Sequence, residues 1–153
     1  MLLHVKSGEL YPVNFLPLHP LDIKQGMRNW EKAFNWSIYF GYRNVELYKL
    51  VIRGNDDIQG VIALERKLDH VYVHLIESAP RNRKYRVFKR VGLHLIAFAC
   101  KRSMELGHDG AIALDSKSHL IDYYKGIGGR QLGDRYFVFD ELAAERLVRL
   151  YLN

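Results

Sequence analysis

The chain has 153 residues, of which 48% are hydrophobic and 26% are charged, as is usual for a globular domain with its own hydrophobic core. Its single cysteine, Cys100, excludes an internal disulfide and a zinc site built on cysteine pairs, and no apolar run approaches the ~18 residues of a membrane span. The formal net charge is +6. We therefore expect one domain over residues 1–153, located in the cytoplasm, with no membrane partner and no metal, because the seven histidines are scattered.

The N-terminal third predicts a strand followed by helix. Residues up to about Pro20 are strand-like with proline punctuation, and residues 10–16 predict a short strand. Residues 21–40 predict a mainly helical segment, because large apolar side chains recur there at three- and four-residue spacing. The side chains with this spacing are Met27, Trp30, Phe34 and Ile38.

Three successive strands are predicted next, over residues 46–53, 58–66 and 70–77, with turns between them. The third strand carries apolar or aromatic side chains on both faces, so we expect it to lie in the centre of the sheet.

A strand–helix–strand unit follows. Residues 88–106 predict a helix that ends at Gly107, and residues 111–114 predict a short buried strand. With the strand at 70–77 they form a right-handed βαβ unit. The expected buried stripe of the helix is Val91, Leu95, Phe98 and Ala99.

The C-terminal part predicts a short helix over residues 118–125 with Ser118 as its cap, a strand over 136–139, and a final helix from Asp140 to about Tyr151. Taken together, the elements predict an α/β protein of the α+β type, with a mixed sheet that is mostly antiparallel.

A cluster of positive charge lies between Arg81 and Arg90, where six basic residues and no acidic ones account for the whole net charge. Because the cluster precedes a helix N-terminus, whose amides are unpaired, it predicts an anion-binding site, and a phosphate above all. The alternative is a solvated loop. The six residues are Arg81, Arg83, Lys84, Arg86, Lys89 and Arg90.

The order of elements over residues 46–139 resembles the GNAT superfamily of acyl-CoA N-acyltransferases. The family's phosphate loop, Gln/Arg-x-x-Gly-x-Gly/Ala before an apolar helix, is matched by residues 87–92. Gly92 keeps its glycine, whereas Val87 and Arg90 replace the polar residue and the first glycine.

A second pattern of the family is a tyrosine followed four or five residues later by glycine. Tyr124 with Gly128 and Gly129 fits this pattern, and Lys117 stands where the family has asparagine. The resemblance implies a GNAT-like fold with one parallel βαβ unit that binds acetyl-CoA as co-substrate, and an N-acetyltransferase activity.

The resemblance also implies where the cofactor binds. Backbone amides at residues 88–93 would hold the pyrophosphate, and basic side chains of the cluster would add charge. The expected cofactor-binding residues are Ile76, Ser78, Arg83, Arg86, Phe88, Lys89, Arg90, Val91, Gly92, Leu93 and Lys117.

The catalytic roles follow from the same comparison. Backbone N–H groups at residues 76–78 would polarise the thioester carbonyl, and Tyr124 would protonate the leaving thiolate. Glu77 is the preferred base, with a structural ion pair to a nearby arginine as the alternative. His74 is a second candidate base; simple alternation puts it on the opposite face of the strand from Glu77, and a bulge would change that.

Two further residues are assigned to packing. Tyr123 is the neighbour of Tyr124, and Cys100 is expected to fill space inside the long helix. The acceptor amine, on a small molecule, a protein or an aminoacyl group, would enter opposite the cofactor, between the early helices and the central strand. Early aromatic residues would form one wall of its site.

Two other functions are considered. The Arg81–Arg90 cluster, interleaved with Tyr85 and Phe88, would suit an RNA-binding module, although no other part of the chain extends its charge. A non-catalytic acyl-CoA-binding protein is the other alternative. The oligomeric state is open, with a homodimer as one option.

Overall fold

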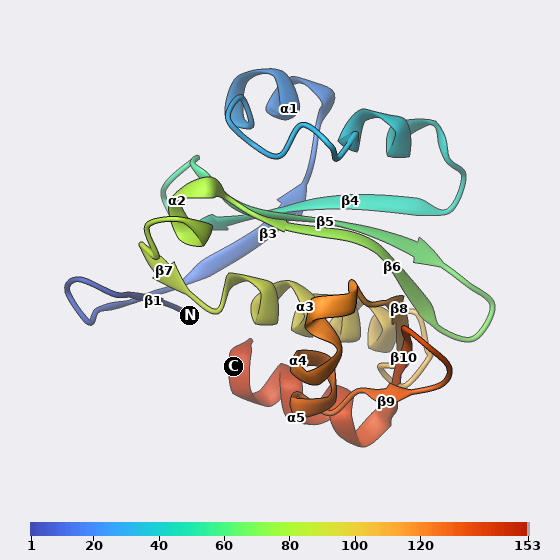
Figure 1. Ribbon diagram of the computed structural model, residues 1–153. Helices are drawn as coiled ribbons and strands as arrows, with labels where there is room; N and C mark the ends of the chain where they lie inside the picture. The colour runs from blue at the N-terminus through green and yellow to red at the C-terminus, as the bar shows by residue number, and fades with distance from the viewer. Residues whose placement is uncertain (153) are drawn as a thin grey trace.

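A seven-stranded sheet organises the computed structural model, which describes residues 1–152 (Figure 1). Its spatial order is β3 (Val13–Pro17), β4 (Val45–Ile52), β5 (Ile58–Arg66), β6 (Val71–Ser78), β8 (Ile112–Asp115), β10 (Tyr136–Phe139) and β9 (Arg130–Gln131). The strand β6 lies in the centre, as predicted, and β6–β8 is the parallel pair.

Helices cover both faces of this sheet (Figure 1). On one face, α3 (Val91–Glu105) and α5 (Glu141–Tyr151) pack against each other and enclose the larger core, which includes Leu95, Ile62 and Phe137. On the other face lie α1 (Pro20–Gly26) and the 3₁₀ helix η1 (Trp36–Gly41), over a smaller cluster. Burying each large apolar side chain contributes about 1.5–3 kcal/mol, so both layers are held by the hydrophobic effect.

The predicted βαβ unit is confirmed as β6–α3–β8, and its two strands separate along their length. They pair only from Val71 with Ile112 to Val73 with Leu114. Beyond Val73, β6 continues to Ser78, paired with β5 alone among the described residues. The gap that opens between the two strands lies in front of the N-terminus of α3 and determines where the site can form.

A β-bulge interrupts the alternation of β6. Val73 pairs with Leu64 and Leu75 pairs with Ala63, so His74 has no partner opposite it on β5. The side chains of Val73 and Ile76 consequently face the larger core, whereas Leu75 faces the smaller cluster around η1. The bulge places His74 and Glu77 on the same face of β6.

The helix predicted over residues 21–40 is wrong in its middle. Only α1 and η1 form, and residues 27–35 are irregular. Met27 and Trp30 do become buried, but they turn inward from a folded loop and do not share one helical face, while Ile38 is 45% exposed. The spacing of apolar residues therefore predicted that this segment is buried, but it did not predict the backbone conformation.

The start of the long helix also differs from the prediction. Residues Phe88–Lys89 form β7, which pairs with β1 (Leu2–His4), and the helix begins at Val91. Arg90 separates them in a left-handed conformation with φ of 64°, which a helix cannot contain. The strand expected over residues 10–16 is split: β2 (Leu10–Tyr11) pairs with β1, and β3 pairs with β4.

Three short elements complete the fold. The basic cluster begins with a turn of helix, α2 (Pro80–Arg83). Ser118 does not cap a helix but begins the 3₁₀ helix η2 (Ser118–Leu120), which precedes α4 (Ile121–Gly126). The predicted cap of α5 is confirmed, because the Asp140 side chain accepts a hydrogen bond from the Ala143 amide.

Candidate functional site

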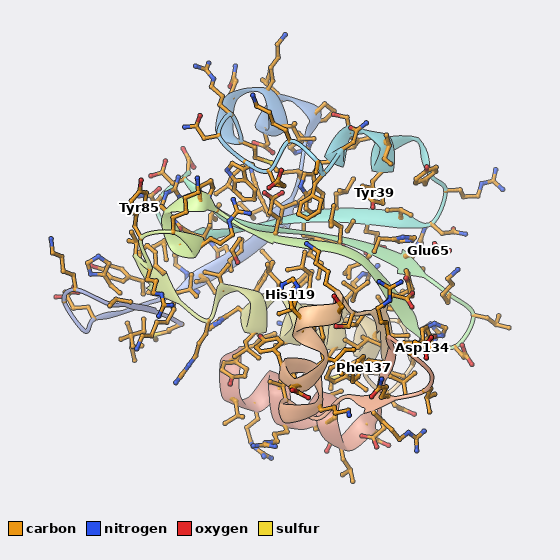
Figure 2. All side chains as sticks on the ribbon, in the orientation of Figure 1. Tyr39, Glu65, Tyr85, His119, Asp134 and Phe137 are labelled. Atoms are coloured by element: carbon orange, nitrogen blue, oxygen red, sulfur yellow. The ribbon has the colours of Figure 1, made fainter. Side chains whose placement is uncertain are left out.

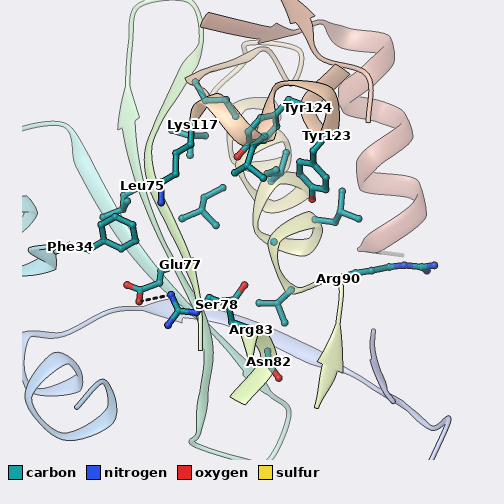
Figure 3. A pocket seen from close by; sticks show the side chains of 18 of the residues that line it. Phe34, Leu75, Glu77, Ser78, Asn82, Arg83, Arg90, Lys117, Tyr123 and Tyr124 are labelled. Atoms are coloured by element: carbon teal, nitrogen blue, oxygen red, sulfur yellow. Dashed lines mark ion pairs between the residues drawn. The ribbon is translucent and has the colours of Figure 1, made fainter. Parts of the chain in front are cut away.

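A cleft of about 470 Å³ opens where β6 and β8 separate (Figure 3). Its walls come from the end of β6, the start of α3, the end of β8 and α4. Eleven of the predicted site residues line it: Ile76, Glu77, Ser78, Arg83, Phe88, Arg90, Val91, Gly92, Leu93, Lys117 and Tyr124. Two others, Arg86 and Lys89, are exposed and do not line it.

The N-terminus of α3 offers unpaired amides to this cleft. The first helical hydrogen bond runs from the His94 amide to the Arg90 carbonyl, so the amides of residues 91–93 have no acceptor within the helix. A Cβ added at Gly92 would have one neighbour within 4 Å, the Tyr123 hydroxyl at 3.9 Å. The backbone here can therefore approach a ligand closely, and the helix dipole favours an anion.

The expected cradle is shorter than predicted at its N-terminal end. The Phe88 amide donates to Asn82 Oδ1 at 3.0 Å and is not available to a phosphate. The amide group of Asn82, which is buried, also donates to the carbonyl of Gln59, at 3.2 Å. Asn82 therefore ties the loop before α3 to the sheet, a role that no pattern around it in the sequence indicated.

Arg90 replaces a family glycine, and its backbone has the conformation that glycine adopts without strain. Its side chain extends away from the cleft in Figure 3, toward solvent. The backbone of Arg90 thus performs the turn that starts α3, while its guanidinium lies outside the space between the strands.

We expect Arg90→Gly to raise the free energy of unfolding by about 0.5–1 kcal/mol, because the left-handed conformation costs a non-glycine residue about 1–2 kcal/mol and glycine loses part of that gain in entropy. Urea denaturation measures this. The matched control is Lys89→Gly, which removes the same charge from the adjacent strand and should lower stability. An unchanged or lower stability of Arg90→Gly would contradict this account.

Glu77 lies on the cleft but is fully engaged. Its carboxylate accepts hydrogen bonds from the Glu31 amide at 2.9 Å and from Trp36 Nε1 at 2.7 Å, and Arg83 Nη1 lies 3.9 Å away. Glu77 is only 3% exposed. Glu77 therefore anchors residues 31–36 to the central strand.

His74 is half-buried beside Glu77 and lines both the cleft and an adjoining hollow. Its Nε2 lies 2.7 Å from Glu65 Oε1, and its ring packs edge-on against Tyr72. Sequence reasoning ranked His74 below Glu77, because its carboxylate partner becomes visible only when β5 and β6 are paired.

Two tyrosines of α4 line the opposite wall (Figure 3). Tyr124 packs against Phe137, and burial raises the pKa of its hydroxyl. Tyr123, which the sequence analysis assigned to packing, is 39% exposed and lines the cleft, and its hydroxyl lies near Gly92. Gly129 supports this wall, because its amide donates to the Tyr124 carbonyl and a Cβ there would lie 2.8 Å from that oxygen.

Two further residues complete the cleft. The Lys117 ammonium lies over the ring of Phe34, 4.3 Å from its centroid, at the end nearest η1. Cys100, in contrast, is fully buried in α3, and burial raises the pKa of its thiol to about 12, which confirms its assignment as filler.

Two absences apply to residues 1–152. None of their helices is both long and apolar enough to cross a membrane. Within the same residues, no group of three or more His, Cys, Asp or Glu side chains is placed to hold a metal ion.

Comparisons with known proteins establish the fold. No protein-family model matches the sequence, and a comparison with curated proteins finds no match. A protein described as a streptothricin acetyltransferase from Bacillus anthracis, solved in complex with acetyl coenzyme A, aligns with a TM-score of 0.62 at 16% identity, over 84% of this chain and 98% of that chain.

Two further solved structures align over similar lengths. An acetyltransferase of the GNAT family from Staphylococcus aureus gives a TM-score of 0.56 at 14% identity, over 84% of this chain and 99% of that chain. The ribosomal-protein-S18-alanine N-acetyltransferase from Escherichia coli gives 0.58 at 14% identity, over 82% and 89%. The predicted GNAT fold is confirmed.

Proposed function

We propose that this protein, which has the GNAT fold, transfers an acetyl group from acetyl-CoA to an acceptor amine. The observation that carries the proposal is the cleft between β6 and β8, which has the unpaired amides of α3 at one end and the hydroxyl-bearing wall of α4 beside it. An elongated ligand with phosphates at one end and a reactive group further along matches this arrangement.

The residues present fit acetyl-CoA. The amides of residues 91–93 would bind the pyrophosphate, and Gly92 leaves room for it. Arg83 lies on the cleft and is 39% exposed, so it would add positive charge near the phosphates. The unpaired edge of β6 at residues 76–78 would hydrogen-bond the remainder of the ligand.

The transfer needs one bond to form and one to break. The amine nitrogen attacks the acetyl carbonyl carbon and gives up a proton as the new bond forms, and an amide of residues 76–78 would stabilise the oxyanion. The carbon–sulfur bond then breaks, and the leaving thiolate would take a proton from the Tyr124 hydroxyl. Because the pKa of Tyr124 is raised, this hydroxyl keeps its proton at neutral pH and can donate it.

The acceptor is proposed only as a primary amine. A turnover assay that follows thiol release should include streptothricin and a peptide with N-terminal alanine, the groups named for two of the similar structures, together with spermidine and an aminoacyl-tRNA. An amine that is acetylated in this assay would identify the class of acceptor.

An RNA-binding function remains the second candidate, because Tyr85, which follows α2, is 78% exposed. Shallow hollows around it are lined by the basic residues Arg28, Lys32, Arg81 and Lys84. Such an aromatic and basic surface suits a nucleic acid. Calorimetry with plain RNA at two salt concentrations tests it.

Gly92→Glu is expected to weaken acetyl-CoA binding at least tenfold, because a carboxylate at the second position of α3 would repel the pyrophosphate. Calorimetry measures the affinity, which we expect to be sub-millimolar for the unmodified protein. The matched control is Leu142→Glu, which adds a carboxylate at the same position of α5, where the side chain is 77% exposed and no ligand is expected.

These measurements separate the functions. An unmodified protein that does not bind acetyl-CoA at sub-millimolar concentration would exclude both acetyl transfer and passive acyl-CoA binding. Tight, salt-sensitive RNA binding in that protein would favour the RNA-binding function. Acetyl-CoA binding without turnover of any amine would favour the non-catalytic alternative.

A further inference from the structure

One histidine on the cleft is arranged for proton transfer. The bulge in β6 directs His74 toward η1, where its ring lies between Tyr72, at 4.8 Å between ring centroids, and Tyr39, at 5.6 Å. It forms part of the wall shared by the cleft and by the hollow beside Tyr39 and Tyr42. Among the described residues, His74 is the one lining residue that the cleft and this hollow have in common.

Glu65 holds His74 in one orientation. Its Oε1 lies 2.7 Å from His74 Nε2, while its Oε2 forms an ion pair with Lys67 Nζ at 2.8 Å. The hydrogen bond from Lys67, followed by that from His74, lowers the pKa of Glu65, so this carboxylate stays charged at neutral pH. A charged acceptor at Nε2 places the proton of the neutral ring there and leaves the lone pair on Nδ1.

Other acid–base groups on this side of the cleft are already occupied. Both oxygens of Glu77 accept hydrogen bonds, and the Asp115 carboxylate accepts a hydrogen bond from the Tyr72 hydroxyl. Among residues 1–152, His74 Nδ1 has no hydrogen-bond partner. The ionisable groups around the imidazole, from all elements near it, are Glu65, Lys67, Tyr72, Tyr39, Tyr42, Arg43 and Asp115.

We propose that His74, oriented by Glu65, accepts the proton of the acceptor amine, and that the amine enters from the hollow beside Tyr39 and Tyr42. This inference rests on the proposed acetyl transfer. Nδ1 takes a proton from the amine nitrogen as that nitrogen bonds to the acetyl carbon, and the Glu65 carboxylate stabilises the resulting imidazolium. In Figure 2, Tyr39 and Glu65 lie at one end of the sheet, with Tyr85 and its basic surface at the other.

Bromoacetyl-CoA tests the position of the imidazole without an acceptor. This reagent carries an electrophilic carbon at the acetyl position, and a neutral imidazole there forms a nitrogen–carbon bond while bromide leaves. We expect mass spectrometry to find the adduct on His74. All variants should carry Cys100→Ala, so that no thiol reacts.

His74→Gln should slow the alkylation at least tenfold. Glu65→Gln should keep the reaction but spread the adduct over both ring nitrogens, because a neutral amide no longer fixes the ring proton on Nε2. A merely structural role for Glu65 would leave the alkylated nitrogen unchanged. The control is His119→Gln, which alters an exposed histidine that does not line the cleft. Unfolding curves of each variant show whether the fold is retained.

The outcomes distinguish a failure of the His74 assignment from a failure of the proposed acetyl transfer. An adduct on Glu77 or Tyr124, or a rate unaffected by His74→Gln, would overturn the role of His74 while leaving acetyl transfer standing. If acetyl-CoA neither binds nor protects against the reagent, the proposed transfer itself fails, and this inference fails with it.

Discussion

Glu77→Ala is expected to lower the free energy of unfolding by about 3 kcal/mol. The substitution leaves the Glu31 amide and Trp36 Nε1 without their acceptor. The buried indole donor costs about 1–3 kcal/mol when unpaired, and the partly buried Glu31 amide adds a smaller cost. Arg83 adds little, because its side chain is 39% exposed and 3.9 Å away, so water screens the pair. Residues 31–36, which carry Phe34 to the cleft, should loosen first.

Urea denaturation measures this loss, and two variants calibrate it. Glu77→Gln retains one acceptor oxygen and should lose about half as much. Glu141→Ala, at an exposed position in the first turn of α5, should change stability by about 1 kcal/mol or less. A loss below about 1 kcal/mol for Glu77→Ala would mean that Glu77 does not anchor this segment, and its role as a base would regain support.

The same variants distinguish an anchor from a base. If Glu77 is an anchor and His74 is the base, Glu77→Gln should fold and retain most of its turnover, whereas His74→Gln should fold and lose it. The reverse pattern would return the proton transfer to Glu77. The two residues lie on one face of β6, so the comparison is made within a single site.

The sheet and its parallel unit were predictable because their signals are local. Apolar residues on both faces of residues 70–77 indicated a central strand, and the apolar helix between two such strands indicated the crossover. Asp140 indicated a helix start, and its side chain forms that cap. Each of these signals lies within a few residues of the element that it predicts.

The features that the sequence did not reveal depend on distant pairing. The bulge at His74 exists only in the register between β5 and β6, and the partner of its ring comes from nine residues earlier. The donors to Glu77 lie 46 and 41 residues away. No short-range pattern carries this information, so the contacts of Glu77 and His74 could not be predicted from the sequence.

The segment that matches the phosphate loop contains one feature with a local signal and one that depends on distant pairing. Gly92 was predictable as the close-approach glycine, since the pattern fixes its place before the helix. The loss of the preceding residues to β7 was not predictable, because it requires β1, from the other end of the chain, to pair with Phe88 and Lys89. The positive charge of the cluster lies beside the cleft, although only Arg83 and Arg90 of its six residues line it.

Tyr124→Phe is expected to lower kcat about 100-fold and to leave KM for acetyl-CoA nearly unchanged. A positioned general acid contributes about 10²–10⁴-fold to a rate, and without it the thiolate must leave unprotonated or take its proton from water. Burial raises the pKa of Tyr124 above its ordinary value of 10.0, so this acid stays protonated to beyond pH 10. No loss of activity from its ionisation should therefore be seen at any lower pH.

Tyr123→Phe is the matched control, because the neighbouring hydroxyl lines the same cleft but lies above Gly92, at the end assigned to the phosphates. We expect it to weaken acetyl-CoA binding modestly and to leave kcat within a few-fold. Steady-state kinetics with an amine that turns over separates the two tyrosines. If Tyr123→Phe abolished turnover and Tyr124→Phe did not, the acid would be Tyr123, and the thioester would lie closer to the start of α3 than to the end of β8.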